Sequence, residues 1–339
     1  MKCLEGGAAV YLLTGAAGFL GSEVARLLLE QGLAVRALVL PGDPLAAKLP
    51  PQVDIITGDL LNPQDLDRFF VVPEGEPLTL IHCASLITMS MAPVPRVYQV
   101  NVEGTRNLVE RCLKAGAGMI HVGSVHAIRE KPHGQVMAEP ESVSPDNVVG
   151  YYAKTKAEAV ALVLQARQQR GLRASVVYPA GLTGPGDYAR GNLTQLFLDY
   201  LAGKITVGVK GGYNFADVRD VARAIVTLAA RGNLGEDYVL AGEFISILDI
   251  LKVFHEVTGG RRVTATVPVW LARAVLPLMG LVYKIRGVKP IFSAYSLYTV
   301  GANSHFDSGK ARRDLGYQSR PIRETLADTA RWLLAREKG

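Results

Sequence analysis

Residues 8–21, AAVYLLTGAAGFLG, decide the fold that the sequence predicts. The apolar run ends at Thr14, and a helical pattern begins after three glycines, Gly15, Gly18 and Gly21. A short apolar run is typical of a buried parallel strand. Glycines let the following turn bend sharply and approach a pyrophosphate, whose charge the N-terminus of the next helix stabilises. The stretch therefore predicts a nucleotide-binding turn between a strand and a helix.

Apolar runs that predict strands alternate with helical patterns through much of the chain. The further predicted strands are 34–40, 53–57, 79–84, 118–124, 174–178 and 238–241. The predicted helices are 23–31, a short helix from 62, 97–115, 150–169, 193–202, 218–230 and 322–336. This alternation predicts an α/β fold, a Rossmann-type doubly wound parallel sheet with helices on both faces. Ligands are then expected beyond the carboxyl ends of the strands.

The pattern also predicts two domains. Residues 1–182, joined by 215–242, are predicted to form the dinucleotide-binding domain. Residues 183–214 and 243–339 are predicted to form most of a smaller mixed α/β substrate lobe. Two segments, 129–149 and 181–192, are predicted to be loops because Pro, Gly, Ser and Asn interrupt any regular pattern there.

Composition and charge exclude several classes of protein. The 339 residues are 49% hydrophobic and 20% charged, and 37 basic residues against 31 acidic ones give a net charge of +6. The basic residues are scattered, so nucleic-acid binding is not expected. The three cysteines suit a reducing cytoplasm, and none shows metal-ligand spacing, so no metal site is predicted.

No membrane-spanning segment is predicted. The most apolar stretch, AVLPLMGLVY at 274–283, has ten uncharged residues, which is too short to cross a bilayer. A buried or surface-lying helix is expected there. The N-terminus lacks the pattern of a signal peptide, and a cytoplasmic location is therefore expected.

Three residues have the types and spacing of a proton-transfer site. Tyr152 and Lys156 lie four residues apart at the start of a predicted helix, so they share one face. A phenol has a pKa near 10, and an ammonium group one turn away favours the phenolate. Ser124, at the end of a predicted strand, is expected beside Tyr152 and against the same substrate oxygen. These three are the predicted catalytic residues.

On these motifs the chain resembles the extended short-chain dehydrogenase/reductase superfamily, which includes NAD-dependent epimerases and dehydratases, over nearly its whole length. Residues 14–21 match the TGxxGxxG turn, and residues 152–156 match the YxxxK motif. Further matching segments are 58–60, 82–85, 101–105, 179–182, 184–187, 215–222 and 310–317. The branch that it resembles most is the one of dihydroflavonol-reductase-like and 3β-hydroxysteroid-dehydrogenase-like enzymes.

The resemblance implies a nicotinamide dinucleotide cofactor. Asp59 is implied to contact adenine, but it also has the position of a helix cap, and Asn101 is likewise a candidate N-cap. Lys156 is implied to hold the ribose. The implied cofactor contacts are Gly15, Ala17, Gly18, Phe19, Leu20, Gly21, Leu40, Asp59, Leu60, Cys83, Ala84, Ser85, Asn101, Tyr152, Lys156, Pro179, Gly181 and Leu182.

Leu40 favours NAD(H) over NADP(H). Relatives that bind the 2′-phosphate often end the second strand with arginine, whereas this chain has Leu40. Asp43 lies within reach of a ribose hydroxyl. Arg36 and Lys48 are the remaining candidates to meet a phosphate.

Departures from the family pattern narrow the reaction. Residues 125–127 replace the acidic pair of sugar dehydratases, and Tyr213-Asn214 stands where epimerases tend to have an arginine for the diphosphate. The chain is therefore predicted to transfer hydride between nicotinamide and a ketone or secondary alcohol. A nucleotide-sugar epimerase, with Arg190 or Arg219 meeting the diphosphate, and a non-catalytic dinucleotide sensor stay as alternatives.

The predicted substrate is a small hydrophobic molecule, steroid-like or aromatic, because the expected pocket walls are apolar. Its candidate contacts are Leu86, Met89, His126 and Asn192. The 86–92 loop, LITMSMA, suits either an apolar ligand or packing against the smaller lobe. His82 and His121 are expected to be satisfied core residues. A homodimer is left open as the assembly.

Overall fold

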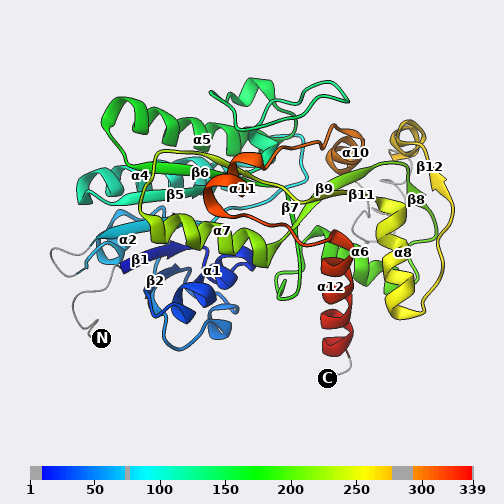
Figure 1. Cartoon of the computed structure of the whole chain (residues 1–339), viewed down its shortest axis with the longest axis horizontal. Coiled ribbons are helices and arrows are strands. Elements are labelled where there is room, and N and C mark those ends of the chain that lie inside the picture. The colour runs from blue at the N-terminus through cyan, green and yellow to red at the C-terminus, as the bar shows by residue number, and fades with distance from the viewer. Residues whose placement is uncertain (1–9, 73–76, 277–292, 338–339) are drawn as a thin grey trace.

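A seven-stranded parallel sheet forms the centre of the computed structural model, which describes residues 10–72, 77–276 and 293–337 (Figure 1). The strand order is β10-β6-β5-β4-β1-β2-β3, and neighbouring strands run parallel. The strands are β1 (Val10–Thr14), β2 (Ala34–Val39), β3 (Asp54–Thr57), β4 (Leu78–His82), β5 (Gly118–Val122), β6 (Ala174–Pro179) and β10 (Tyr238–Leu240). The predicted α/β class with a Rossmann-type parallel sheet is confirmed.

The strand order reverses at β1, which pairs with β2 on one side and β4 on the other. Thr14, the last residue of β1, lies opposite Leu38 of β2 and His82 of β4. In doubly wound folds the ligand crevice opens beyond the carboxyl ends of the strands at such a reversal. The glycine turn that follows Thr14 therefore lies at the mouth of this crevice.

Helices cover both faces of the sheet (Figure 1). Because side chains alternate along a strand, β1 contributes Leu13 to one hydrophobic core and Leu12 to the other. The helices of the first face are α1 (Phe19–Glu30) and α7 (Val218–Arg231). The helices of the second face are α4 (Gly104–Ala115) and α5 (Tyr151–Arg170), with α2 (Pro63–Phe69), α3 (Pro95–Tyr98) and a π-helical turn (Gln99–Glu103) before α4.

A third hydrophobic core, which includes Phe197, Phe254 and Leu326, lies in the smaller part of the molecule. Helices α8 (Ile247–Thr258) and α12 (Ile322–Glu337) pack side by side there (Figure 1). Its strands are β7 (Gly181–Thr183), β9 (Gly212–Asp217) and β11 (Glu243–Ser246) in one sheet, and β8 (Gly208–Val209) and β12 (Thr266–Val267) in another. Its helices are α6 (Asn192–Leu201), α8 (Ile247–Thr258), α10 (Ala294–Gly301) and α12 (Ile322–Glu337), and α11 (Gly309–Leu315) packs on α7. The exact domain boundaries stay a prediction.

Three elements differ from the prediction. Helix α1 begins at Phe19 rather than at residue 23, because Gly18 is already its N-cap and accepts a hydrogen bond from the Ser22 N–H at 2.9 Å. Strand β7 occupies part of the segment predicted as a loop, since it pairs with β9 from a distant part of the chain. The predicted helix 97–115 starts at Pro95 and contains the π-helical turn.

The segment 129–149 is irregular, as predicted, but it is not only a surface loop. Met137 is buried and forms an isolated bridge with Phe306. The Asn303 side-chain amide donates to the backbone carbonyls of Lys131, Pro132 and Gln135 at 3.1, 3.1 and 2.8 Å. The chain that follows the predicted catalytic serine is therefore tied to residues near the C-terminus.

The apolar stretch 274–283 lies mostly outside the described residues. Within the ranges that the structure describes, none of the helices has the length and apolar character needed to cross a membrane.

A partly buried ion-pair network joins the start of α7 to α12 and to the segment before it. Asp217 caps α7 by accepting from the Arg219 N–H at 2.8 Å, and it also binds the Arg219 guanidinium at 2.7 Å. Arg219 reaches Asp328 at 3.0 Å, while Arg320 binds Asp220 at 2.6 Å. Burial opposes ionisation of Asp217, but hydrogen bonds from Arg219 outweigh it and lower the pKa of the carboxyl group. Its charge is thus a stabilising part of the folded state.

Asp217→Asn should lower the free energy of unfolding by about 3 kcal/mol, because removing one charge of a buried pair leaves the other uncompensated. The amide keeps a capping oxygen, so the loss reports mainly the charge. Asp328→Asn, at a more exposed carboxylate, should cost less than about 1 kcal/mol. Because the folded pKa of Asp217 is lowered, this stabilisation is complete above about pH 4 and disappears as the pH falls through that folded pKa. Urea unfolding at pH 7 measures both variants, and equal losses would contradict the account.

Candidate active site

The glycine turn approaches the end of β4 so closely that a side chain at Gly15 has no room. Gly15 has φ +71°, and a Cβ atom there would lie 2.6 Å from the Ala84 backbone nitrogen. A Cβ on Gly21 would lie 2.1 Å from the Gly15 carbonyl oxygen. The Cys83 N–H donates to the Thr14 carbonyl at 3.1 Å and joins the two strand ends. The predicted turn is therefore confirmed as a tight cradle between β1, α1 and β4.

The N-terminus of α1 carries no compensating negative group. Gly18 is its N-cap and supplies no side-chain hydrogen bond, and the first turn contains no acidic residue. The first-turn N–H groups, from Phe19 to Gly21, lack intrahelical acceptors, and the helix dipole adds positive potential there. These features fit the pyrophosphate of a dinucleotide.

The structure brings most of the predicted cofactor contacts to one edge of the sheet. Leu40 follows β2, Asp59 and Leu60 follow β3, Cys83, Ala84 and Ser85 follow β4, and Pro179, Gly181 and Leu182 lie at the end of β6 and in β7. Ala17, Phe19 and Leu20 belong to the turn and first turn of α1. The carboxyl ends of parallel strands share one edge, so these residues form one rim around the crevice.

Tyr152 lies in the first turn of α5 and is almost fully buried. Burial raises the pKa of Tyr152 to about 12, and hydrogen bonds with the Ser85 and Ser124 side chains oppose this rise. Ser124 sits just after β5 and accepts a hydrogen bond from the His126 N–H at 3.2 Å. The expected lowering of the tyrosine pKa is therefore wrong for the protein alone, because desolvation outweighs the nearby polar groups. Ser85, predicted only as a cofactor contact, is a second hydroxyl partner of Tyr152.

Lys156 is one turn further along α5, and only 3% of it is exposed. Its Nζ donates to the Val122 carbonyl oxygen at 2.5 Å. Burial lowers the pKa of Lys156 to about 8, and Cys83 opposes this shift. Among the described residues no carboxylate forms an ion pair with Lys156, so its charge is available to a ligand in the crevice.

Asn101 fixes the loop after β4 against α5. Its side-chain oxygen accepts from the Leu86 N–H at 2.8 Å, and its amide donates to the Leu86 carbonyl at 2.9 Å and to Thr155 Oγ1 at 3.0 Å. The residue lies inside the π-helical turn, so the N-cap interpretation is wrong. Asn101 Oδ1 also accepts from the Ser85 hydroxyl at 3.1 Å, so Asn101 supports the loop next to the candidate catalytic residues.

The cationic side chains near the second strand are already engaged. Arg36 binds Asp54 at 2.6 Å and also bonds the Val71 carbonyl. The Lys48 ammonium lies 4.5 Å from the centre of the Tyr188 ring, a cation–π contact. Leu40 is 47% exposed and offers no charge. Asp59 accepts from the Leu61 N–H at 2.9 Å within its own turn and pairs with Arg96 at 3.1 Å. The N-cap of the following helix, α2, is Asn62, so the helix-cap interpretation of Asp59 is wrong, and its adenine contact stays a prediction.

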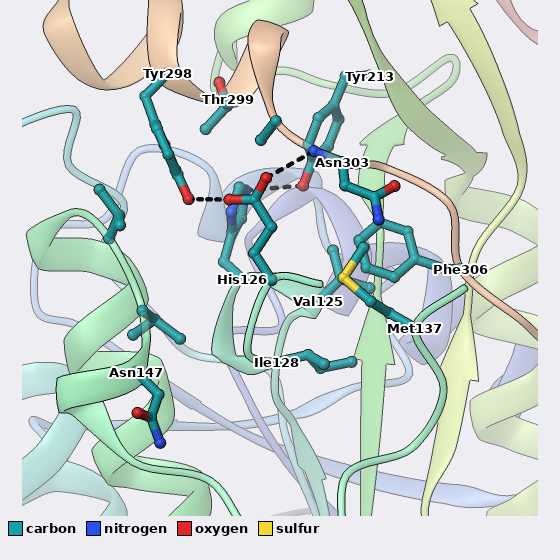
Figure 2. A pocket seen from close by; sticks show the side chains of 14 residues that line it. Val125, His126, Ile128, Met137, Asn147, Tyr213, Tyr298, Thr299, Asn303 and Phe306 are labelled. Atoms are coloured by element: carbon teal, nitrogen blue, oxygen red, sulfur yellow. Dashed lines mark hydrogen bonds between the residues drawn. The ribbon is translucent and has the colours of Figure 1, made fainter. Parts of the chain in front are cut away.

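His126 joins two tyrosines beside the catalytic centre. Its Nε2 lies 2.9 Å from the Tyr213 hydroxyl, and its Nδ1 lies 3.2 Å from the Tyr295 hydroxyl. Its ring meets the Tyr152 ring edge to face, with centroids 6.1 Å apart. Figure 2 shows His126 and Tyr213 in the wall of a cavity of about 50 Å³. Tyr295 was not predicted, because no local pattern relates it to a residue 169 positions earlier.

The other predicted substrate contacts are less closely placed. Leu86 is 39% exposed at the start of the 86–92 loop, and Met89 is partly buried in it. The loop is held to α5 by the Tyr151 N–H, which donates to the Ser90 carbonyl at 3.2 Å. Asn192 is exposed at the start of α6, and within the described chain no hydrogen bond joins it to the catalytic residues. Its role, like those of Leu86 and Met89, stays a prediction.

The two strand histidines differ. His82 is satisfied by Thr14 Oγ1 at 2.7 Å and Thr105 Oγ1 at 3.0 Å, as expected. Both ring nitrogens of His121 are buried without a partner, so the expectation of a satisfied residue is wrong there. Burial lowers the pKa of both imidazoles. Among residues 10–72, 77–276 and 293–337, no group of three potential metal ligands is present.

The fold and the cradle define a dinucleotide-binding enzyme scaffold. The model of the NAD dependent epimerase/dehydratase family matches residues 11–241, and the chain belongs to this family. The family uses NAD or NADP, and the residues described above fit such a group.

Relatives with several different names align with nearly the whole chain. Sterol demethylase protein B of Methylococcus capsulatus is 30% identical over 97% of this chain and 98% of that protein. A putative dihydroflavonol 4-reductase of Synechocystis is 31% identical over 95% of this chain and 94% of that protein. The crystal structure of gox2253 is similar with a TM-score of 0.82 and 31% identity, covering 97% of this chain and 98% of that one. A UDP-glucose 4-epimerase of Thermotoga maritima, at 22% identity and a TM-score of 0.75, shares the fold.

NADH binding should weaken as the pH rises through about 8, because Lys156 loses its charge there. With one linked proton, the dissociation constant should rise by up to about tenfold per pH unit. Lys156→Met should bind more weakly at pH 7, and its affinity should not change between pH 7 and 9.5. Cofactor fluorescence titrations measure both proteins. A wild-type affinity that is equally flat across this range would show that Lys156 does not hold the cofactor.

Proposed function

We propose that this protein is an NAD(P)-dependent oxidoreductase that interconverts a ketone and a secondary alcohol. The observation that carries the proposal is the placement of the buried Tyr152 beside the hydroxyls of Ser85 and Ser124, one turn from the buried Lys156. This group lies at the sheet edge next to the glycine cradle, where a bound nicotinamide would be within reach. A protein that only senses dinucleotide has no need for a buried proton donor of this kind.

The chain's own residues would act on the substrate oxygen. In ketone reduction Tyr152 gives its phenolic proton to the carbonyl oxygen, and Ser124 orients that oxygen by a hydrogen bond. The bound nicotinamide supplies the hydride to the carbonyl carbon, and it accepts one in the reverse direction. The Lys156 ammonium, one turn along α5, would stabilise the tyrosinate and so offset the high pKa that burial gives Tyr152.

An apolar, uncharged substrate fits the charges around this centre. Arg219, a candidate to meet a diphosphate, is bound to both Asp217 and Asp328. Tyr213, which stands where epimerases tend to have an arginine, is hydrogen-bonded to His126. An unpaired diphosphate in a cleft costs several kcal/mol, whereas apolar surface gains roughly 25 cal/mol per Å² on burial. The names of the relatives, a dihydroflavonol reductase and several 3β-hydroxysteroid dehydrogenases, agree with this substrate class.

A screen of two compound classes tests the proposal. We expect NADH oxidation or NAD⁺ reduction with members of a panel of steroid and aromatic ketones and secondary alcohols that includes 1-tetralone. UDP-glucose should give neither redox change nor epimerised product, which a sugar product assay would detect. Tyr152→Phe should lower kcat at least 100-fold and leave NADH affinity within about twofold, since the phenol acts on substrate. Epimerised sugar together with no redox turnover of the panel would contradict the proposal.

Leu40, the residue that follows β2, favours NAD(H) over NADP(H) as the cofactor. Leu40→Arg should shift the ratio of kcat/KM values towards NADPH by about tenfold or more, because a guanidinium–phosphate pair is a strong charge-assisted contact. Leu40→Gln, which adds a polar group without charge, is the matched control and should leave the ratio within about twofold. A wild-type enzyme that strongly prefers NADPH would contradict this assignment. Lys48 would then be the candidate to bind the 2′-phosphate.

A further inference from the structure

A short helical stretch, residues 269–276, lies beside α10 in the smaller part of the molecule (Figure 1). One side of this stretch faces the protein. Val269, Ala272 and Leu276 are only partly exposed, and their spacing of three and four residues puts them on one side of a helix. A Cβ on Gly301 of α10 would lie 3.6 Å from the Val269 side chain. The stretch is therefore packed on α10 through this side.

The opposite side of the stretch is exposed and also apolar. Trp270 is 69% exposed, Leu271 37% and Val275 40%. Ala274 is exposed as well, and helical spacing puts the four residues next to one another. A surface helix normally carries polar residues opposite its buried side. These four residues, named the outer face below, therefore form an apolar surface without an obvious role in the fold.

Two distant segments of the chain meet next to the outer face. Strand β8 pairs with β12, and the Lys210 N–H donates to the Val267 carbonyl at 2.8 Å. The Tyr200 hydroxyl, near the end of α6, donates to the Arg261 carbonyl at 2.9 Å. Leu201 and Val207, in the first of these segments, are each 37% exposed. The two segments thus add exposed apolar residues to the same part of the smaller lobe.

The charge of these two segments is of one sign. Residues 200–212 and 259–276 contain no aspartate or glutamate. Their basic residues are all exposed, and they are Lys204, Lys210, Arg261, Arg262 and Arg273. Exposed tryptophan and aliphatic residues next to basic ones are typical of protein surfaces that bind anionic lipid, because tryptophan favours the headgroup level and basic residues favour the negative surface.

We propose that the outer face docks on the surface of a bilayer that contains anionic phospholipids. Its apolar side chains enter the interface, and the surrounding basic residues contact the headgroup phosphates. The charge favours lipid over a second copy of this chain, because a two-fold contact on this face would bring the same basic residues together without acidic residues to oppose them. The inference concerns binding alone and does not depend on the proposed reaction.

Co-sedimentation of the full chain with phospholipid vesicles tests this inference. Binding to phosphatidylcholine vesicles with about 30% phosphatidylglycerol should be at least about tenfold tighter than binding to phosphatidylcholine alone. Raising the salt concentration to about 0.5 M should remove most of this preference, because salt screens the charges.

Trp270→Ser tests the apolar contribution. It should weaken binding to the anionic vesicles by about tenfold or more, because it removes the largest apolar side chain of the outer face. Val71→Ser, at a residue that is 67% exposed just after α2, is the control and should keep the wild-type affinity. Both side chains are exposed, so both variants should fold.

The double variant Arg261→Gln, Arg262→Gln tests the contribution of charge. Each arginine should contribute about fivefold to the affinity for the anionic vesicles. The matched control is Arg223→Gln, Arg331→Gln, which removes the same charge from two exposed arginines on α7 and α12. The control should change the affinity by less than about twofold.

Tryptophan fluorescence locates the contact. The chain has two tryptophans, Trp270 and Trp332, and Trp332 packs against Tyr188 and Arg336. In Trp332→Phe the emission of Trp270 should shift to shorter wavelength when anionic vesicles are added, and brominated lipid should quench it. In Trp270→Phe the emission of Trp332 should stay unchanged.

Several results would overturn the inference. These are no binding to the anionic vesicles, equal binding to both kinds of vesicle, and binding that Trp270→Ser and the Arg261/Arg262 double variant both keep. A dimer that Trp270→Ser dissociates, in a protein that does not bind vesicles, would show that a second copy covers the outer face instead. None of these results affects the proposed oxidoreductase function, which is measured without lipid.

Discussion

The close approach of the β1 turn to the end of β4 is the constraint on which the site depends. Position 15 has no space for a Cβ atom against the Ala84 backbone, and position 21 has none against the Gly15 carbonyl. Because the strand order reverses between β1 and β4, this contact lies where the crevice of the sheet opens. It aims the uncapped end of α1 into the crevice and sets the loop that carries Ser85 beside it. The glycine turn and the loop that carries Ser85 are therefore held side by side at this edge of the sheet.

The candidate catalytic residues Tyr152 and Lys156 are buried in surroundings with little charge. Burial raises the pKa of Tyr152 to about 12 and lowers that of Lys156 to about 8, so desolvation disfavours the charged form of each. The positive nicotinamide ring of a bound cofactor would lower the pKa of Tyr152, and its negative pyrophosphate would raise the pKa of Lys156. Both changes would favour the charged forms that proton transfer requires. Next to Tyr152, the neutral His126 and the two tyrosines that it contacts, Tyr213 and Tyr295, add further uncharged polar groups. The site thus suits chemistry on an uncharged carbonyl compound.

Local patterns predicted the central fold well, and they also placed the candidate catalytic residues on particular elements of it. The apolar runs and the glycine turn placed the parallel sheet, and the spacing of Tyr152 and Lys156 placed both on one face of α5. Features that depend on distant segments were missed. Strand β7 forms only because β9 pairs with it, and Tyr295 reaches His126 from 169 residues away. Burial, which decides the pKa of Tyr152, is likewise a property of the packed molecule rather than of the YxxxK spacing.

The proposed reaction transfers hydride from the nicotinamide to a carbonyl carbon, and the product leaves as an alcohol. Reduction of 1-tetralone with NADH deuterated at the transferable position, followed by mass spectrometry of the product, tests it directly. We expect one deuterium in each alcohol molecule formed, with loss of the label from the cofactor. A cofactor that keeps its label while the enzyme converts UDP-glucose to an epimer would contradict it.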